Sequence, residues 1–187
     1  MDERKWIERI LAGDTQSFSC LVAKYEKMAY TIALRILENR EEAEEAVQDA
    51  LVKMYRALSD FHFDSKFSTW FYRIVYRTAL TALRQQRMFV SYEEAGPVDL
   101  SNDEVESATA LLEREDRKEM IARTLKKLPA DEALLLTLYY LEECSVEEIC
   151  QITELSASNV KVKLFRGRKR FYEVLQDKMK LETADLL

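Results

Sequence analysis

Residues 145–170 carry side chains suited to reading DNA. Ser145 and Glu148 have the spacing of a capping box at the start of a short helix, and Ser156 offers a second N-cap just after Leu155. Polar and basic side chains follow at Ser156, Ser158, Asn159, Lys161, Lys163, Arg166, Arg168 and Lys169. A capped helix, a tight turn and a basic second helix form the helix-turn-helix that places side chains in a DNA major groove.

The position of each residue along the basic helix predicts what it contacts. Residues at the start of a recognition helix reach base edges, where Asn159 could pair with adenine and Lys161 with guanine. Arg166, Arg168 and Lys169 lie farther along, where contact with phosphate or with a protein partner is expected. Phosphate contacts position a protein on DNA but do not specify sequence.

A second segment, residues 60–87, combines aromatic and basic side chains, which suits single-stranded nucleic acid. Bases stack on rings while cations follow the backbone, at about 1–3 kcal/mol per stacked base. We expect Trp70, Phe71 and Ile74 to lie in the core, and the rings of the loop and His62 to be free for DNA. The candidate contacts are Phe61, His62, Phe63, Ser65, Lys66, Phe67, Arg73, Arg77 and Arg84.

Residues for enzymatic chemistry are scarce. His62 is the only histidine, and the sequence has no glycine-rich phosphate loop and no nucleophile elbow. The three cysteines form no CxxC pair, and Cys144 and Cys150 do not have a standard zinc spacing. The sequence therefore predicts no catalytic residues, no metal site and no cofactor.

The charge of the chain is strongly segregated, although its net charge is only −6. Residues 156–180 carry a net charge of +6 and residues 65–92 a net charge of +5. Residues 93–116 carry −8, and residues 131–155 hold seven acids and no lysine or arginine. The basic segments can attract phosphate, whereas the acidic segments must face water or a basic protein surface.

The elements that carry these residues are predicted to be helices. The chain of 187 residues has only three glycines and two prolines, which favours an all-helical protein. Apolar spacing predicts helices over about 3–11, 16–38, 41–58 and 68–87, with Asp14 as an N-cap, and a second helical unit from about 113. The acidic segment between them contains Gly96–Pro97. The fold class is therefore all-α, with two small helical bundles joined by an acidic flexible linker and a helix-turn-helix in the second.

No apolar run approaches the roughly 20 residues that span a bilayer. The start, MDERKWIERI, lacks the apolar core of a secretory signal. We therefore expect a cytoplasmic protein with no membrane insertion of its own.

At this point the chain resembles bacterial sigma factors in two places. Their second domain is similar to AEEAVQDALVKMYRALSDF (43–61) followed by KFSTWFYRIVYRTALTALRQQR (66–87). Their fourth domain is similar to LPADEALLLTLYYLEECSVEEICQITELSASNVKVKLFRGRKR (128–170). Having these two domains alone is typical of the extracytoplasmic-function (ECF) group of the sigma-70 family. The implied boundaries are 14–89 for domain 2, 90–112 for the linker and 113–178 for domain 4.

The resemblance implies a promoter-specificity subunit with three kinds of partner: core RNA polymerase, promoter DNA and an anti-sigma factor. The helix-turn-helix would read the −35 element, and the 61–87 segment would open the −10 element by capturing a flipped base. Such a pocket must repay the few kcal/mol that extruding a base costs. In the family, the acidic helix binds the largest polymerase subunit. The matching contacts here are Glu45, Gln48, Asp49, Lys53 and Arg56.

The sequence departs from the family pattern at four positions. Glu154 stands where relatives often have glycine in the turn, and a left-handed backbone would strain it. Gly167 lies inside the basic helix, at a cost of about 1 kcal/mol relative to alanine. Arg77 and Thr81 stand where relatives often carry Asn and Asp, so specificity at the −10 element would differ.

The alternative is a stand-alone helix-turn-helix regulator that binds duplex DNA as a dimer. It would explain residues 128–170 but not the acidic helix or the aromatic loop. The two hypotheses differ in whether specific promoter binding needs core polymerase.

Overall fold

The described part of the chain folds into α-helices and one short 3-10 helix. The computed structural model describes the backbone of residues 3–90 and 112–184 and the side chains of residues 3–86 and 119–177. The helices are α1 (Glu3–Leu11), α2 (Thr15–Leu37), α3 (Arg40–Arg56), η1 (Leu58–Asp60), α4 (Phe67–Val90), α5 (Leu112–Lys126), α6 (Ala130–Tyr140), α7 (Val146–Thr153) and α8 (Ala157–Ala184). The predicted all-α class is confirmed, and residues 91–111 of the predicted linker lie outside the described residues.

Short polar side chains fix the starts of the first helices. Asp14 caps α2, where its carboxylate accepts a hydrogen bond from the Gln16 amide at 3.0 Å. Asn39 caps α3 by accepting from the Glu42 amide at 3.2 Å. Between them, Glu38 ends α2 in a left-handed conformation, so the chain turns sharply from α2 into α3.

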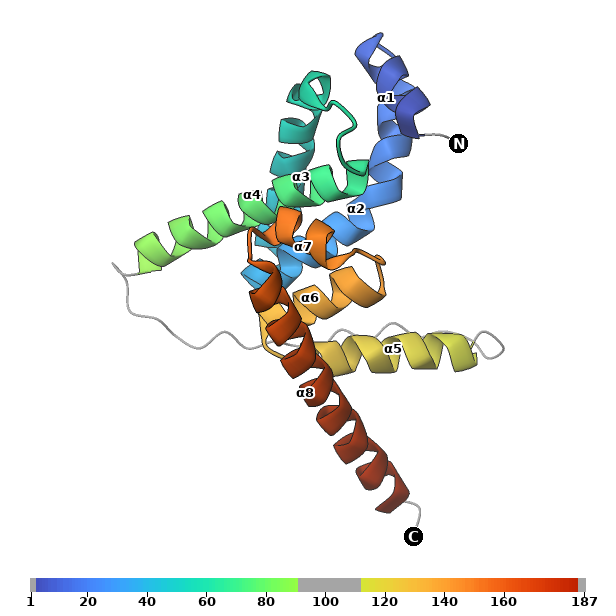
Figure 1. Ribbon diagram of the computed structural model, residues 1–187, viewed down its shortest axis with the longest axis vertical. Coiled ribbons are helices and arrows are strands. Elements are labelled where there is room, and N and C mark those ends of the chain that lie inside the picture. Colours follow the sequence, from blue (N-terminus) through green and yellow to red (C-terminus); the bar gives the residue numbers. More distant parts are fainter. Residues whose placement is uncertain (1–2, 91–111, 185–187) are drawn as a thin grey trace.

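Helices α1 to α4 form the first bundle, in which α2, α3 and α4 pack on one another and α1 packs on α2 (Figure 1). Its core is built from apolar side chains that recur at helical spacing, among them Leu21, Ile32, Met54, Phe71 and Val75. This packing leaves the acidic outer face of α3 exposed, whereas part of the basic face of α4 lies against α7.

Helices α5 to α8 form the second bundle, and α7 and α8 form its helix-turn-helix. Ile149 and Ile152 of α7 pack with Val160 and Leu164 of α8 and are almost fully buried. Helix α6 is buried on nearly every side from Glu132 to Leu138, since α8 covers one face and α2 another. A helix that is apolar all round is buried all round.

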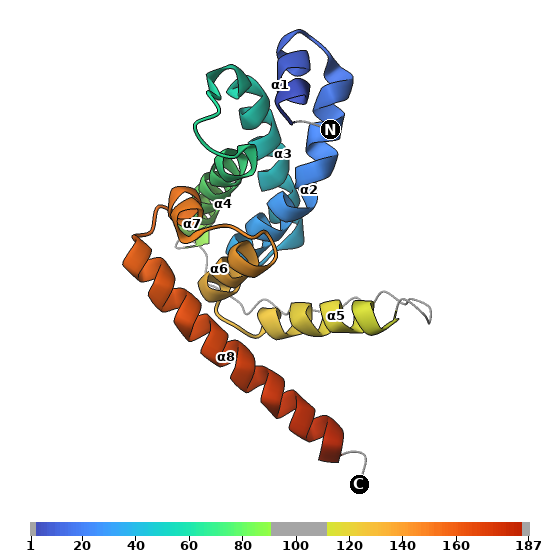
Figure 2. The ribbon, with the colours of Figure 1, turned by 45° about the vertical axis from the view of Figure 1, so that its right-hand side comes forward.

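The two bundles pack against each other, an arrangement that the sequence did not predict. Helix α7 lies along α4, and α6 lies against α2 (Figures 1 and 2). The distal part of α8 extends away from this junction (Figure 2). Among the described helices, none is both long enough and apolar enough to cross a membrane.

Candidate nucleic-acid interface

The turn between α7 and α8 is fixed by local hydrogen bonds. The predicted capping box is present: the Glu148 amide donates to the Ser145 hydroxyl at 3.1 Å, and the Ser145 amide donates to the Glu148 carboxylate at 2.8 Å. The expected cap on α8 is present too, since the Asn159 amide donates to the Ser156 hydroxyl at 3.3 Å. The sequence therefore specified both helix starts correctly.

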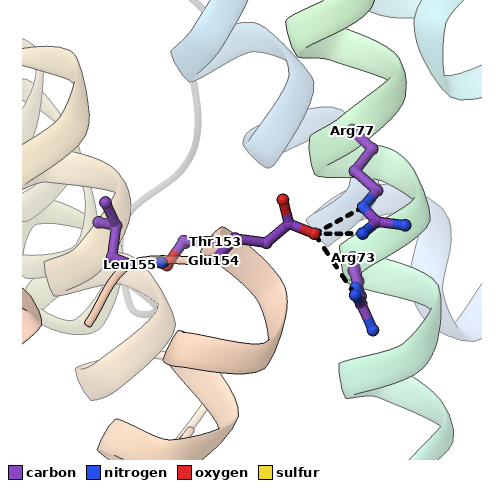
Figure 3. Close-up of polar contacts among 5 residues, drawn as sticks. All are labelled: Arg73, Arg77, Thr153, Glu154 and Leu155. Atoms are coloured by element: carbon purple, nitrogen blue, oxygen red, sulfur yellow. Dashed lines mark hydrogen bonds and ion pairs between the residues drawn. The ribbon is translucent and has the colours of Figure 1, made fainter. Parts of the chain in front are cut away.

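Glu154 ends α7 in a left-handed conformation, with φ 62° and ψ 14°, at the turn position where relatives often have glycine. Its amide donates to the Cys150 carbonyl at 2.8 Å. The neighbouring Thr153 hydroxyl donates to the Ile149 carbonyl at 2.7 Å and accepts from the Leu155 amide at 3.5 Å. These bonds hold the backbone of the turn, from which the Glu154 side chain extends towards α4 (Figure 3).

The side chains at the start of α8 face solvent. Ser156, Ser158, Asn159 and Lys161 are exposed, as expected of residues that reach base edges. Arg166, Arg168 and Lys169 are exposed as well. Arg168 donates to the Tyr140 hydroxyl at 3.3 Å, and the Lys169 ammonium lies 3.9 Å from Glu173.

Lys163 differs from the other predicted contacts because it is only partly exposed and pairs with Asp131 at the start of α6. Burial raises the pKa of the Asp131 carboxyl, but the hydrogen bond and charge of Lys163, together with backbone hydrogen bonds, outweigh burial, so the pKa lies below its ordinary value. In this arrangement Lys163 joins α8 to α6, and its predicted contact with the −35 element stays a prediction.

Gly167 allows α8 to approach α6 closely. A Cβ atom at this position would lie 3.2 Å from Leu136 Cδ1 and 3.3 Å from Glu132 Cβ. Beside this crossing, Arg170 donates to the buried Glu132 carboxylate at 2.9 Å. The glycine that costs helix propensity is therefore explained by close packing of two helices.

The aromatic loop before α4 contains both buried and exposed rings. Phe61 and Phe67 are buried, and their ring centroids are 5.5 Å apart. The Phe63 ring lies 4.8 Å from that of Phe61 and is 37% exposed, and His62 is exposed. Phe63 adopts a positive φ of 62°, which turns the chain at the loop tip. Phe61 and Phe67 thus support the loop, whereas His62 and Phe63 reach its surface.

The side chains expected in the core of α4 lie where the sequence indicated. Phe71 is fully buried, while Trp70 and Ile74 are partly buried against the core. The polar candidates lie nearer the surface. Ser65 is half-buried, and Arg84 is exposed.

Three basic residues predicted to bind −10 DNA contact acids of α7 and its C-cap in this structure, and their contact with DNA stays a prediction. The Lys66 ammonium lies 3.0 Å from Glu148. Arg77 donates through Nε to Glu154 at 2.8 Å and also through Nη2, and Arg73 Nη2 lies 3.4 Å from the same oxygen (Figure 3). Lys66, Arg73 and Arg77 of the basic segment therefore face Glu148 and Glu154 of the acidic segment of the same chain.

A buried tyrosine adds a fourth polar contact between the bundles. The Tyr72 hydroxyl donates to the Glu142 carboxylate at 2.9 Å, and its side chain is almost fully buried. Burial and the nearby Glu142 raise the pKa of Tyr72 above its ordinary value, so the hydroxyl stays protonated and donates. Sequence reasoning missed Glu142, Glu148 and Glu154 as partners, although opposite charges in segments 65–92 and 131–155 were a usable signal.

The outer face of α3 forms a separate exposed surface. Every residue predicted to bind polymerase is exposed there: Glu45, Gln48, Asp49, Lys53 and Arg56. Val52 and Tyr55 are each 49% exposed beside them, so apolar area accompanies the charges. Lys53 also donates to the Thr78 hydroxyl at 3.2 Å, which ties α3 to α4.

Comparison with protein families matches the two halves of the chain in order. Residues 21–88 match the model of Sigma-70 region 2, and residues 118–171 match the model of Sigma-70 region 4. The first match covers α3, the aromatic loop and most of α4, and the second covers the helix-turn-helix.

Curated relatives span almost the whole chain. The RNA polymerase sigma-H factor of Pseudomonas aeruginosa is 31% identical over 181 residues, covering 93% of this chain and 94% of that protein. The ECF RNA polymerase sigma-E factor of Escherichia coli is 30% identical over 170 residues, covering 87% of this chain and 88% of that protein.

Solved structures share the fold. The sigma factor RpoE of Bartonella quintana, in complex with the anti-sigma factor NepR, has a TM-score of 0.70 at 18% identity, covering 86% of this chain and 98% of that chain. CnrH, in complex with the cytosolic domain of CnrY, has a TM-score of 0.61 at 20% identity, covering 94% of this chain and 97% of that chain.

Proposed function

Because this chain belongs to the ECF group of the sigma-70 family, we propose that it binds core RNA polymerase and directs initiation at specific promoters in the cytoplasm. Sigma factors are initiation factors rather than enzymes, in agreement with a sequence that predicts no catalytic residues. The observation that carries the proposal is that region 2 and region 4 match in order within a chain that aligns end to end with sigma factors.

We assign polymerase binding to the exposed face of α3. This face combines charges at Glu45, Asp49 and Arg56 with the half-exposed apolar side chains of Val52 and Tyr55. Polar residues around an apolar centre are the usual composition of a protein interface. The face lies outside the contacts between the two bundles.

We assign the −10 element to the loop and helix from Phe61 to Arg84, and base capture to the loop tip. His62 and Phe63 are the exposed members of the aromatic cluster, and the buried rings of Phe61 and Phe67 form a rigid base beneath them. A stacking surface of this kind favours melted DNA over duplex DNA, so strand opening would need no ATP from this protein.

We assign the −35 element to the exposed start of α8. Ser158, Asn159 and Lys161 lead the helix that enters the major groove, and Arg166, Arg168 and Lys169 lie farther along, where phosphate contacts are expected. The proposed domain boundaries are 14–89 and 113–178, joined by the linker 90–112. Since RpoE of Bartonella quintana is in complex with an anti-sigma factor and CnrH with the cytosolic domain of CnrY, we also propose an anti-sigma partner.

Run-off transcription with purified core polymerase on the gene's own upstream region tests the function. The wild-type chain should give a transcript of defined length, whereas core polymerase alone should not. The Asp49→Lys variant should give less transcript because like charges opposed across an interface can cost several kcal/mol. Glu26→Lys is the matched control, because Glu26 is also an exposed helical acid of the first bundle but lies on α2. The absence of a specific transcript from the wild type would contradict the proposal.

A further inference from the structure

The contact between Glu154 and the two arginines of α4 joins the proposed −35 reader to the proposed −10 reader. We propose that in the free chain Glu154 occupies Arg73 and Arg77 in place of DNA phosphate, so that the protein masks its own −10-reading helix. This inference rests on the proposed function, because it concerns the availability of the arginines assigned to the −10 element.

The contact consists of charge-assisted hydrogen bonds from two guanidinium groups to one carboxylate. One oxygen of Glu154 accepts from Arg77 Nε at 2.8 Å and from Arg77 Nη2, and it lies 3.4 Å from Arg73 Nη2 (Figure 3). The two arginines are four residues apart on α4, so one carboxylate reaches both. Guanidinium groups bind carboxylate and phosphate with the same donors. Glu154 and a DNA phosphate therefore compete for Arg73 and Arg77.

The identity of residue 154 supports a role beyond ending a helix. Its φ of 62° lies in the left-handed region, where glycine would avoid the strain that a side chain introduces. The backbone bond from its amide to Cys150 does not need a glutamate. The carboxylate is what glutamate adds, and the hydrogen bond from Arg77 holds the pKa of that carboxyl below its ordinary value.

The contact is one of several along the same junction. Lys66 pairs with Glu148 at 3.0 Å, and Tyr72 donates to Glu142 at 2.9 Å. Lys66, Arg73 and Arg77 belong to segment 65–92, which has a net charge of +5, and their acidic partners belong to segment 131–155, which has a net charge of −7. We name the three contacts the cross-bundle latch: Lys66 with Glu148, Tyr72 with Glu142, and Glu154 with Arg73 and Arg77.

The expected effect is moderate because Glu154 and both arginines are about half exposed. We call the chain open when the contacts of the cross-bundle latch are broken, and closed when they are made. An exposed ion pair contributes little to stability, so loss of the Glu154 carboxylate should raise the population of the open form about two- to fivefold. The apparent affinity for a ligand that needs the open form rises by the same factor while the closed form dominates.

Glu154→Gln is the deciding variant, and Glu147→Gln is its matched control. Both remove one exposed charge from α7 or its C-cap, but Glu147 lies in the first turn and contacts neither arginine in the described structure. A third variant, Glu154→Gly, removes the carboxylate and relieves the positive φ. If it opens the chain as Glu154→Gln does, the charge rather than the strain is responsible.

Energy transfer between dyes on the two bundles measures opening in the full free chain. One dye is placed on Cys20, which is exposed on α2, and the other on a Lys127→Cys substitution after α5, in a Cys150→Ser background. The Glu154→Gln variant should show lower transfer than the Glu147→Gln variant. Raising the salt concentration from 0.05 to 0.5 M should lower the energy transfer of the Glu147→Gln variant towards the value of the Glu154→Gln variant, because salt screens the ion pairs of the latch.

Binding of a fluorescent oligo-dT of twelve nucleotides measures how far the latch keeps Arg73 and Arg77 from single-stranded DNA. The Glu154→Gln variant should bind about two- to fivefold more tightly than the Glu147→Gln variant at low salt. Equal transfer in the two variants, or no difference in oligonucleotide binding between them, overturns the proposal. Run-off transcription by the wild type separates the two claims. If the Glu154→Gln variant opens as expected but the wild type directs no initiation, the latch is supported and the proposed function is contradicted. If the wild type directs initiation but the two variants do not differ in opening, the proposed function is supported and the latch is contradicted.

Discussion

The ammonium of Lys66 lies 3.0 Å from one carboxylate oxygen of Glu148, while the other oxygen accepts the Ser145 amide at 2.8 Å. One glutamate therefore caps α7 and joins it to the loop before α4. Burial raises the pKa of the Glu148 carboxyl, but the bonds from Ser145 and Lys66 outweigh it, so the pKa lies below its ordinary value. The same pair raises the pKa of the Lys66 ammonium.

Replacing Glu148 with alanine should destabilise the second bundle. Loss of the capping box typically costs about 1 kcal/mol, and loss of the pair with Lys66 adds to it. Urea unfolding monitored by circular dichroism measures the change. Glu147→Ala is the control, because Glu147 also lies in the first turn of α7 but takes no part in the capping box. Equal unfolding midpoints for the two variants would show that the capping box does not stabilise the fold.

Replacing Gly167 with alanine should also destabilise the protein. Alanine gains about 1 kcal/mol of helix propensity, but overpacking at a close crossing costs about 1–3 kcal/mol. The new methyl group would meet Leu136 and the Cβ of Glu132, which cannot swing away. We expect a net loss of about 1 kcal/mol in urea unfolding. A more stable Gly167→Ala protein would mean that α6 and α8 can move apart freely.

Some of the fold could be predicted from the sequence because its causes are local. The caps by Asp14, Ser145 and Ser156 follow from residue type and spacing, whereas the left-handed conformation of Glu154 was suggested only by the glycine that relatives often carry at this position. The burial of Phe61 could not be predicted in this way, because the sequence pattern of an aromatic residue in a loop is the same whether its ring faces solvent or packs on a neighbouring ring. Its burial depends on tertiary contacts with Phe67 and Trp70.

The packing of the two bundles against each other could not be predicted from the sequence. The opposite charges of segments 65–92 and 131–155 were visible, but charge alone did not say whether the acids faced water, polymerase or the chain itself. The structural reason for glycine at position 167 could not be predicted either, because the close crossing of α6 and α8 depends on how two helices pack together.

Acid should open the cross-bundle latch. The pKa of Glu154 is lowered first by its hydrogen bond to Arg77, and the groups that face it from α4 are Arg73, Arg77 and the neutral Tyr76. A lowered pKa means that the contribution is complete above the ordinary value of 4.5 and is lost as the pH falls below it. Interbundle energy transfer should stay constant from pH 7 to about 5 and then fall. The part due to Glu154 should be missing in the Glu154→Gln variant, and identical profiles would contradict this assignment.

Two substitutions on α8 should separate sequence reading from phosphate binding. Lys161→Ala should relax preference at one or two base pairs of the −35 element, at about 1–3 kcal/mol for a lost bidentate contact. Arg168→Ala should weaken binding to all sequences alike and reduce the salt slope by about one. Competition binding of polymerase holoenzyme to a library of −35 variants at several salt concentrations measures both. Uniform weakening by Lys161→Ala would reassign that residue to the phosphates.

Permanganate footprinting of the −10 thymines detects promoter opening itself, and therefore tests whether this protein opens the −10 element. Core polymerase with the wild-type chain should make these thymines reactive, whereas core polymerase alone should not. A chain in which His62 and Phe63 are both alanine should form closed complexes as the wild type does but leave the thymines largely unreactive. Equal reactivity with the two chains would mean that the loop tip does not capture a base, and no reactivity with the wild type would contradict promoter opening by this protein.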